Sequence, residues 1–151
     1  MSASDLQLVA EATRDRMFAA DAAAKMLGMR VTAIGPGSAT VTMPVRPELL
    51  NGFGICQGGL ITTLADTAFA YACNASGAVT VASGFDVELL APSRDGDLLT
   101  AHAVQVSQAG RTGIYDVGVT NQDGLRIALF RGRSHRLNRQ PVGGPRSAPG
   151  G

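Results

Sequence analysis

The sequence predicts a single α+β domain in which an antiparallel sheet wraps around one long central helix. Three observations predict it: 151 residues suffice for one domain with a core, residues 58–75 form an apolar run of helical length, and four strand-like runs follow. A helix that is apolar on nearly every side has to be buried. A curled antiparallel sheet buries such a helix economically, and the α+β class follows from that.

The N-terminal segment, residues 1–28, is predicted to be helical. Ser4 and Gln7 have the spacing of a capping box, which would open a first helix. Asp21 is placed to cap a short second helix that ends at Gly28.

The sheet domain is predicted to cover residues 29–137. Gly35-Pro36-Gly37 forms the turn between its first two strands, and Gly77 stops the central helix. Consecutive strands with short connections are expected to pair antiparallel. The final segment, 138–151, holds three prolines and four glycines and is expected to be disordered. The predicted strands are residues 29–34, 39–45, 79–90, 98–108, 112–121 and 125–137.

Composition and charge exclude several classes of protein. Hydrophobic residues make up 45% and charged residues 17%, as in an ordinary soluble domain, and no stretch reaches the length of a membrane span. A net charge of +1 argues against a general nucleic-acid binder, which needs a broad basic face. The N-terminus lacks the pattern of a signal peptide. Cys56 and Cys73 adjoin apolar runs and are expected to be reduced thiols, which predicts a cytoplasmic protein.

Asp66 is the charged residue of the apolar helix, and a buried carboxylate is costly unless it is paired or used. On a helical wheel it lies in a polar stripe that could line a cavity, while the aliphatic residues fall largely on the other side. Alternatively, Asp66 accepts a hydrogen bond from Thr62 or Thr63 and holds the helix in place. Both readings stay open at this point. The stripe consists of Gly59, Thr62, Thr63, Asp66, Thr67, Ala70 and Asn74.

Gly58 and Gly59 open this helix and leave its first backbone N–H groups uncovered. The helix dipole adds positive potential there, so a carbonyl oxygen aimed at the helix start would be polarised. The alternative is a tight turn that simply requires glycine.

Other chemistries find no support in the sequence. The two histidines, His102 and His135, have no partner at metal-ligand spacing, so no zinc site is expected. Neither a G-x-S-x-G elbow nor a phosphate-binding P-loop occurs. Cys56 and Cys73 have no basic neighbour in the sequence that would make either a nucleophile.

Four runs together resemble the PaaI-type thioesterases of phenylacetate degradation, and the similarity extends over about residues 20–137. The runs are Asn51-Gly-Phe-Gly-Ile-Cys-Gln-Gly-Gly, Leu64-Ala-Asp-Thr-Ala-Phe-Ala-Tyr-Ala-Cys-Asn, Gly110-Arg-Thr-Gly-Ile-Tyr-Asp and Leu129-Phe-Arg-Gly-Arg-Ser-His-Arg. The resemblance implies a hotdog fold in dimers and usually homotetramers. It implies hydrolysis of arylacetyl thioesters of coenzyme A (CoA), without a metal or a bound cofactor.

The resemblance also implies roles for individual residues. Asp66 matches the family's catalytic acid, Gly59 the glycine whose N–H polarises the thioester carbonyl, and Asn51 a loop asparagine of the site. Two positions depart from the family, because Gln57 and Phe53 stand where histidines are common. Gln57 can hydrogen-bond but cannot carry a proton charge, which keeps a non-catalytic acyl-CoA binder or sensor as the alternative function. A hotdog hydratase ranks below both, because no histidine precedes residue 102.

The end of the chain is basic. From Gly124 onward there are six arginines and no acidic residue. Either this is a solvated strand and tail, or it binds the phosphates of CoA. On period-two alternation, Leu125, Ile127 and Leu129 share a face with Arg131, Arg133 and His135, as in a strand leaving the core for a phosphate site. The candidate contacts to substrate or CoA are Phe53, Thr67, Arg111, Thr112, Arg133 and Ser134.

The active site is predicted to be built from two chains. Gly59 and Asp66 lie seven residues apart on one helix, about 10 Å at ~1.5 Å rise per residue. One thioester carbonyl cannot contact both from a single helix, since each contact needs ~3 Å. Two antiparallel helices across a two-fold axis would bring each Gly59 near the partner's Asp66.

Overall fold

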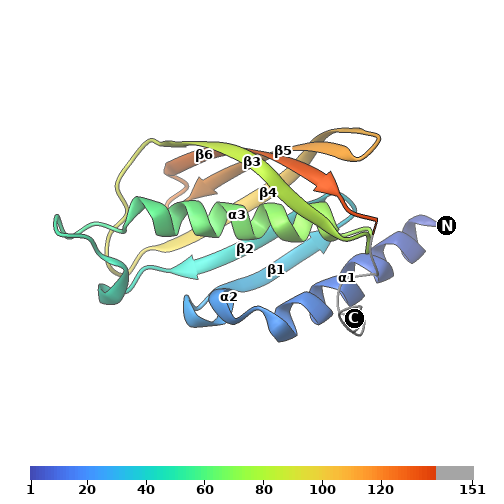
Figure 1. Cartoon of the computed structure of the whole chain (residues 1–151). Helices are drawn as coiled ribbons and strands as arrows, with labels where there is room; N and C mark the ends of the chain where they lie inside the picture. The colour runs from blue at the N-terminus through green and yellow to red at the C-terminus, as the bar shows by residue number, and fades with distance from the viewer. Residues whose placement is uncertain (139–151) are drawn as a thin grey trace, which may run out of the picture.

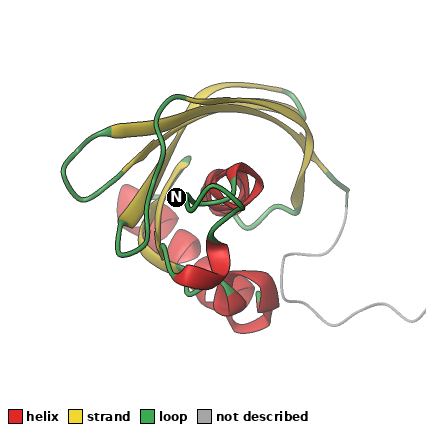
Figure 2. Cartoon of the chain, turned by 90° about the vertical axis from the view of Figure 1, so that its left-hand side faces the viewer, coloured by secondary structure: helices red, strands yellow, loops and turns green. Residues whose placement is uncertain are grey.

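In the computed structural model, which describes residues 1–138, a six-stranded antiparallel sheet curves around the long helix α3 (Figures 1 and 2). The predicted α+β architecture is confirmed. The elements in chain order are α1 (Ala3–Ala20), α2 (Ala22–Met26), β1 (Arg30–Gly35), β2 (Ser38–Pro44), the 3-10 turn η1 (Pro47–Leu49), α3 (Gly58–Asn74), β3 (Thr80–Leu89), β4 (Leu98–Ala109), β5 (Thr112–Thr120) and β6 (Arg126–Arg136). Residues 139–151, most of the segment expected to be disordered, lie outside the described residues.

The N-cap of helix α1 lies two residues earlier than predicted. Ser2 is the N-cap: its hydroxyl accepts a hydrogen bond from Asp5 N–H at 3.1 Å, and its own N–H donates to the Asp5 carboxylate at 2.9 Å. The capping box at Ser4 and Gln7 is therefore wrong, because Ser2 is extended and Ser4 is already helical. Gln7 instead donates to the Ile34 carbonyl at 2.8 Å and ties α1 to β1.

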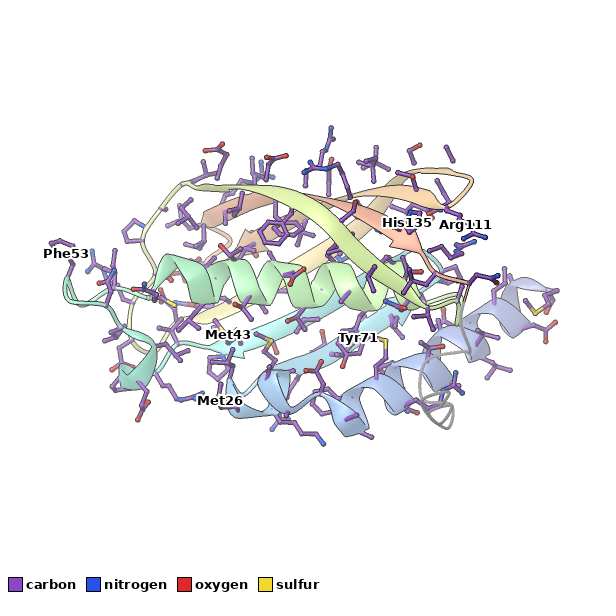
Figure 3. The ribbon with its side chains drawn as sticks, in the orientation of Figure 1. Met26, Met43, Phe53, Tyr71, Arg111 and His135 are labelled. Atoms are coloured by element: carbon purple, nitrogen blue, oxygen red, sulfur yellow. The ribbon has the colours of Figure 1, made fainter. Side chains whose placement is uncertain are left out.

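The second helix is capped as predicted. Asp21 accepts from Ala24 N–H at 3.1 Å through one carboxylate oxygen. Its other oxygen accepts from the hydroxyl of Tyr71 at 3.0 Å. Tyr71 is a fully buried residue of α3 whose ring points toward α1 and α2 (Figure 3). One aspartate thus starts α2 and fastens the N-terminal helices to the central one.

The strand order is β1-β2-β4-β5-β6-β3. The expected pairing of neighbours in sequence holds for β4 with β5 and for β5 with β6, but β3 pairs with β6 and not with β4. The expectation failed because residues 90–97 are not a tight turn. Eight residues reach up to ~26 Å, whereas crossing β5 and β6 requires about 14 Å. Strand β3 therefore forms one edge of the sheet, and β1, packed against α1, forms the other.

The core lies between α3 and the concave face of the sheet. Phe69 packs there, with ring centroids 5.5 Å from Tyr115 and 5.8 Å from Phe130. Gly132 is needed beneath it, because an added Cβ would lie 2.8 Å from the Phe69 ring. Most of the other fully buried core residues are aliphatic, and they include Val41, Leu64, Ala68, Leu99, Val117, Val119 and Ile127.

Strand β6 departs from the predicted alternation at its start. Ile127 is buried although Leu129, Arg131 and His135 are exposed, because the pairing with β5 shifts register between Val119 and Thr120. The face that holds Leu129 and the basic residues is the outer face of the sheet. The prediction that this face leaves the core for the basic end was therefore wrong, because Ile127 lies on the inner face and Leu125 and Leu129 are exposed.

Candidate active site

Asp66 lies in the middle of α3 on a partly exposed stripe, as predicted. Its carboxylate accepts no hydrogen bond from any described residue. The neighbouring threonines bond to backbone instead: Thr62 donates to the Gly58 carbonyl at 2.9 Å and Thr63 to the Gly59 carbonyl at 2.8 Å. The alternative in which Asp66 is held by Thr62 or Thr63 is therefore excluded. Burial raises the pKa of Asp66 above the ordinary value of an aspartate.

Asn74 does not belong to the open stripe. It is 4% exposed, and its side chain accepts from Thr80 N–H and donates to the Thr80 carbonyl, both at 2.9 Å. Asn74 therefore joins the end of α3 to the start of β3. Thr67, the other polar residue beyond Asp66, is half-buried and donates to the Thr63 carbonyl at 2.7 Å.

The first N–H groups of α3 are open. The Gln57 carbonyl accepts from Leu60 N–H at 3.0 Å and from Ile61 N–H at 3.3 Å, but the exposed Gln57 side chain does not cap the helix. Gly58 and Gly59 N–H have no acceptor among the described residues. Two donors therefore remain free at the positive end of the helix, which is where an oxyanion is stabilised.

A groove of about 420 Å³ borders this helix start and distinguishes the two glycines. Gly58 lines it together with Asn51, Cys56 and Leu89, whereas Gly59 does not. A Cβ at Gly58 would lie 2.6 Å from the Leu89 side chain, while one at Gly59 would meet nothing within 4 Å. Sequence reasoning favoured Gly59 and missed the place of Gly58, because Leu89 is distant in the sequence and only the fold reveals the contact.

Asn51 organises the loop that precedes α3. Its side-chain oxygen accepts from Phe53 N–H at 2.9 Å and from Ile55 N–H at 3.4 Å, and its own N–H donates to the Ile55 carbonyl at 2.8 Å. The loop is thereby a closed turn beside the groove. At its tip the Phe53 side chain projects into solvent, 91% exposed (Figure 3).

Both cysteines are buried free thiols. Burial raises the pKa of Cys56, and it raises the pKa of Cys73 to about 12. Since the thiolate is the nucleophilic form, neither residue is suited to attack a thioester at neutral pH.

The two candidate CoA-binding residues on β6, Arg133 and Ser134, lie on opposite faces of the sheet. Arg133 lies on the outer face, where it pairs with Asp86 at 2.8 Å, while Ser134 is 1% exposed on the inner face. One phosphate group cannot contact both. Arg111 has no ion pair within residues 1–138, and Figure 3 places it beside His135 at one end of the sheet. Thr112, exposed, is the register partner of His135.

The fold brings Asn51 and Gly58 together but leaves Asp66 apart from them. Asp66 is not among the residues of the groove, and eight helical positions, about 12 Å, separate it from Gly58. One chain therefore contains both the N–H donors at the start of α3 and the carboxylate of Asp66, but at two separate places on the helix.

Comparison with known proteins identifies the fold and family. The thioesterase superfamily model matches residues 53–128. An acyl-coenzyme A thioesterase PaaI from Escherichia coli is 47% identical over 121 residues, which cover 80% of this chain and 86% of that protein. The chain belongs to the thioesterase superfamily. It is a thioester hydrolase of the PaaI type, as its sequence motifs predicted.

Solved structures agree with this assignment. The thioesterase matches the structure of E. coli PaaI with a TM-score of 0.88 and 44% identity, covering 89% of this chain and 98% of that one. A Streptococcus mutans protein bound to acetyl CoA matches with a TM-score of 0.71 and 25% identity, covering 74% and 90%. The predicted hotdog fold is confirmed.

Two further findings concern residues 1–138. No helix among them is long and apolar enough to cross a membrane. No group of three or more His, Cys, Asp or Glu side chains among them could hold a metal ion.

Proposed function

We propose that this thioesterase hydrolyses acyl-CoA thioesters of the arylacetyl type, phenylacetyl-CoA or its ring-hydroxylated relatives, to the free acid and CoA. The observation that carries the proposal is the Asp66 carboxylate, which is half-buried on the central helix and accepts no hydrogen bond from the part of the chain that the structure describes. The E. coli relative named an acyl-coenzyme A thioesterase supports the substrate class. A protein of the same fold with acetyl CoA bound supports it further.

In the proposed reaction the thioester carbonyl oxygen accepts hydrogen bonds from the free N–H groups at the start of α3. These donors stabilise the negative charge that develops on that oxygen. The ionised Asp66 either attacks the carbonyl carbon, forming an acyl-aspartyl anhydride that water then hydrolyses to the free acid, or takes a proton from the water that attacks the carbonyl carbon itself. The carbon–sulfur bond breaks in either case, and the CoA thiolate takes a proton from water in the first route or from the protonated Asp66 in the second. These steps require neither a metal nor a bound cofactor.

The catalytic unit is a homodimer in this proposal, and two dimers form a homotetramer. The separation between the helix start and Asp66 requires that two chains share each site. Strand β3 supports a second copy of the chain, because it is an edge strand that leaves apolar side chains exposed: Val81 by 43%, Phe85 by 41% and Leu89 by 53%. An uncovered apolar edge of this kind is suited to pairing with another strand.

A second function, acyl-CoA binding without catalysis, is favoured by one observation. Gln57 stands at the N-cap of α3, where its side chain forms no capping hydrogen bond and cannot carry a proton. Were proton transfer needed at that position, the chain would hold its ligand and release it unchanged.

The test is hydrolysis of phenylacetyl-CoA, followed by detection of the free CoA thiol, in the parent protein and in Asp66→Asn. The variant should lose about 10²–10⁴-fold in kcat, because the amide can neither attack nor accept a proton. Unchanged turnover in Asp66→Asn would overturn the proposal. Tight binding without turnover over a panel of aryl and alkyl CoA esters would instead support the binding function.

A further inference from the structure

A second, smaller cavity lies at the opposite end of α3 from the groove. Its volume is about 170 Å³, and it is bounded by the C-terminal turn of α3, by α1, by the β1–β2 turn and by the inner face of β4, β5 and β6. Its wall includes Leu6, Ala72, Cys73, Gln105, Tyr115 and Arg136. A cavity of about 150 Å³ admits a benzene ring, so there is room for a small organic molecule.

Arg136 is the charged residue of this wall, and it has no acidic partner. None of the ion pairs among residues 1–138 involves it, and its Nε atom is buried without a hydrogen-bond acceptor. Ser134, two residues earlier on the same face of β6, is 1% exposed and has a hydroxyl that is likewise without a partner. A buried donor without an acceptor is costly, and of these two residues Arg136 lines the cavity, so the fold leaves its guanidinium there for a ligand to satisfy.

Tyr115 is a second residue of the cavity wall that can donate a hydrogen bond. Its ring packs against Phe69, it lines the cavity, and its hydroxyl has no hydrogen-bond partner among the described residues. Burial raises the pKa of Tyr115, while the charge of Arg136, which lines the same cavity, acts to lower it. Arginine and tyrosine together offer donors to an anion, and no carboxylate lines the cavity to oppose it.

We propose that this cavity binds a small carboxylic acid, with its carboxylate on Arg136 and Tyr115 and its apolar body against Leu6 and Ala72. Asp66 is not among the residues that line this cavity. If the proposed function holds, the acid released by hydrolysis belongs to the same chemical class. The cavity would then let the enzyme bind its product away from the reacting centre.

The experiment is a titration of the ¹⁵N-labelled full-length protein with phenylacetate, acetate and the neutral 2-phenylacetamide, followed by backbone amide shifts. Phenylacetate should shift the amides of Gly37 and Ser76, which border the cavity, with a Kd independent of Asp66→Asn. The neutral amide should bind at least tenfold more weakly, because it lacks the charge. Acetate should also bind more weakly, because it lacks the apolar body. Shifts confined to the groove at Asn51 and Gly58 would overturn the proposal.

Variants separate binding from a structural role of the arginine. Arg136→Gln and Tyr115→Phe should each weaken phenylacetate binding, the first by tenfold or more, whereas Arg126→Gln, at an exposed arginine of the same strand, serves as the matched control and should not. If Arg136 only offsets the negative end of the α3 dipole, Arg136→Gln would lower Tm and leave phenylacetate binding unchanged. That result, or a cavity that holds water and no acid, would refute the site without bearing on turnover of acyl-CoA.

Discussion

At the residue scale, the pKa of Asp66 depends on the lack of a hydrogen-bond donor to its carboxylate among the described residues. The threonines that precede it by three and four positions donate to backbone carbonyls, so no side chain within residues 1–138 holds its carboxylate. Desolvation therefore acts without compensation and raises its pKa. A carboxylate that is unpaired, partly desolvated and reachable is a better base than a paired one.

The pH dependence of catalysis follows from this residue. Both proposed roles need the ionised form, so kcat/KM should fall as pH drops through the pKa of Asp66. Because that pKa is raised, half-maximal activity should lie above pH 3.8, the ordinary value for an aspartate. The measurement is the acid limb of a kcat/KM profile with phenylacetyl-CoA. An acid limb at or below the ordinary value would contradict the desolvated site.

At the element scale, the start of α3 offers free backbone N–H groups, and the end of β6 lies beside an arginine without an ion pair among the described residues. The helix begins with two glycines and no side-chain cap, which leaves its first donors free. The strand ends beside Arg111, which has no ion pair among the described residues, whereas Arg131 and Arg133 are held by Asp116 and Asp86.

Gly58, by its place on the groove, is predicted to supply a donor to the thioester oxygen. Gly58→Pro removes that N–H, and proline is compatible with the first position of a helix. Its ring would meet Leu89, so the variant is made in a Leu89→Ala background, with Leu89→Ala alone as control. The double variant should lose about 10²–10³-fold in kcat relative to that control. Equal activities would point to the N–H of Gly59 as the donor.

CoA affinity should depend more on Arg111 than on Arg133. A guanidinium already paired with a carboxylate gains less from a phosphate than an unpaired one, so Arg111→Gln should raise KM several-fold and Arg133→Gln less. The increase should shrink as salt is added, because exposed charges are screened within ~10 Å at 0.1 M. Steady-state KM at two salt concentrations measures this. A larger effect at Arg133 would reverse the assignment.

At the scale of the whole molecule, one chain contains the oxyanion donors and the carboxylate, but they are too far apart to act on one thioester. About 12 Å of helix separates Gly58 from Asp66, and neither side chain nor backbone can close that distance. The exposed apolar edge at β3 offers a surface through which a second copy would complete each site.

Subunit mixing tests the shared site. Asp66→Asn and the variant blocked at Gly58 should each be nearly inactive as homodimers. In a mixed dimer one site carries both lesions and the other carries neither, so random mixing should restore roughly a quarter of parental activity. Each variant incubated alone through the same unfolding and refolding steps is the control. Mixed dimers that form, as mass spectrometry would show, and remain dead would rule out the two-chain site.

The sequence by itself determined the elements, the fold class and the family. The central helix was predicted at 58–75 and observed at Gly58–Asn74, and β4 was predicted at 98–108 and observed at Leu98–Ala109. Such segments are readable because periodicity and glycine or proline turns are local properties of the chain. The motifs around Asp66 are equally local, which is why the likeness to PaaI-type thioesterases was legible.

Only the tertiary structure decided how these parts meet. Strand β3 pairs with β6, Ile127 points inward at a register shift, and the Asn74 side chain is hydrogen-bonded to the backbone of Thr80. The sequence periodicity of strands, two residues, or of helices, about 3.6 residues, encodes none of these contacts. The same holds for the contact that puts Gly58 on the groove and for the unpartnered polar atoms of Ser134 and Arg136. Each depends on residues far apart in sequence. The local sequence pattern determines on which face of a helix or strand a side chain lies. Which residues that face contacts is determined only when the sheet closes around the helix.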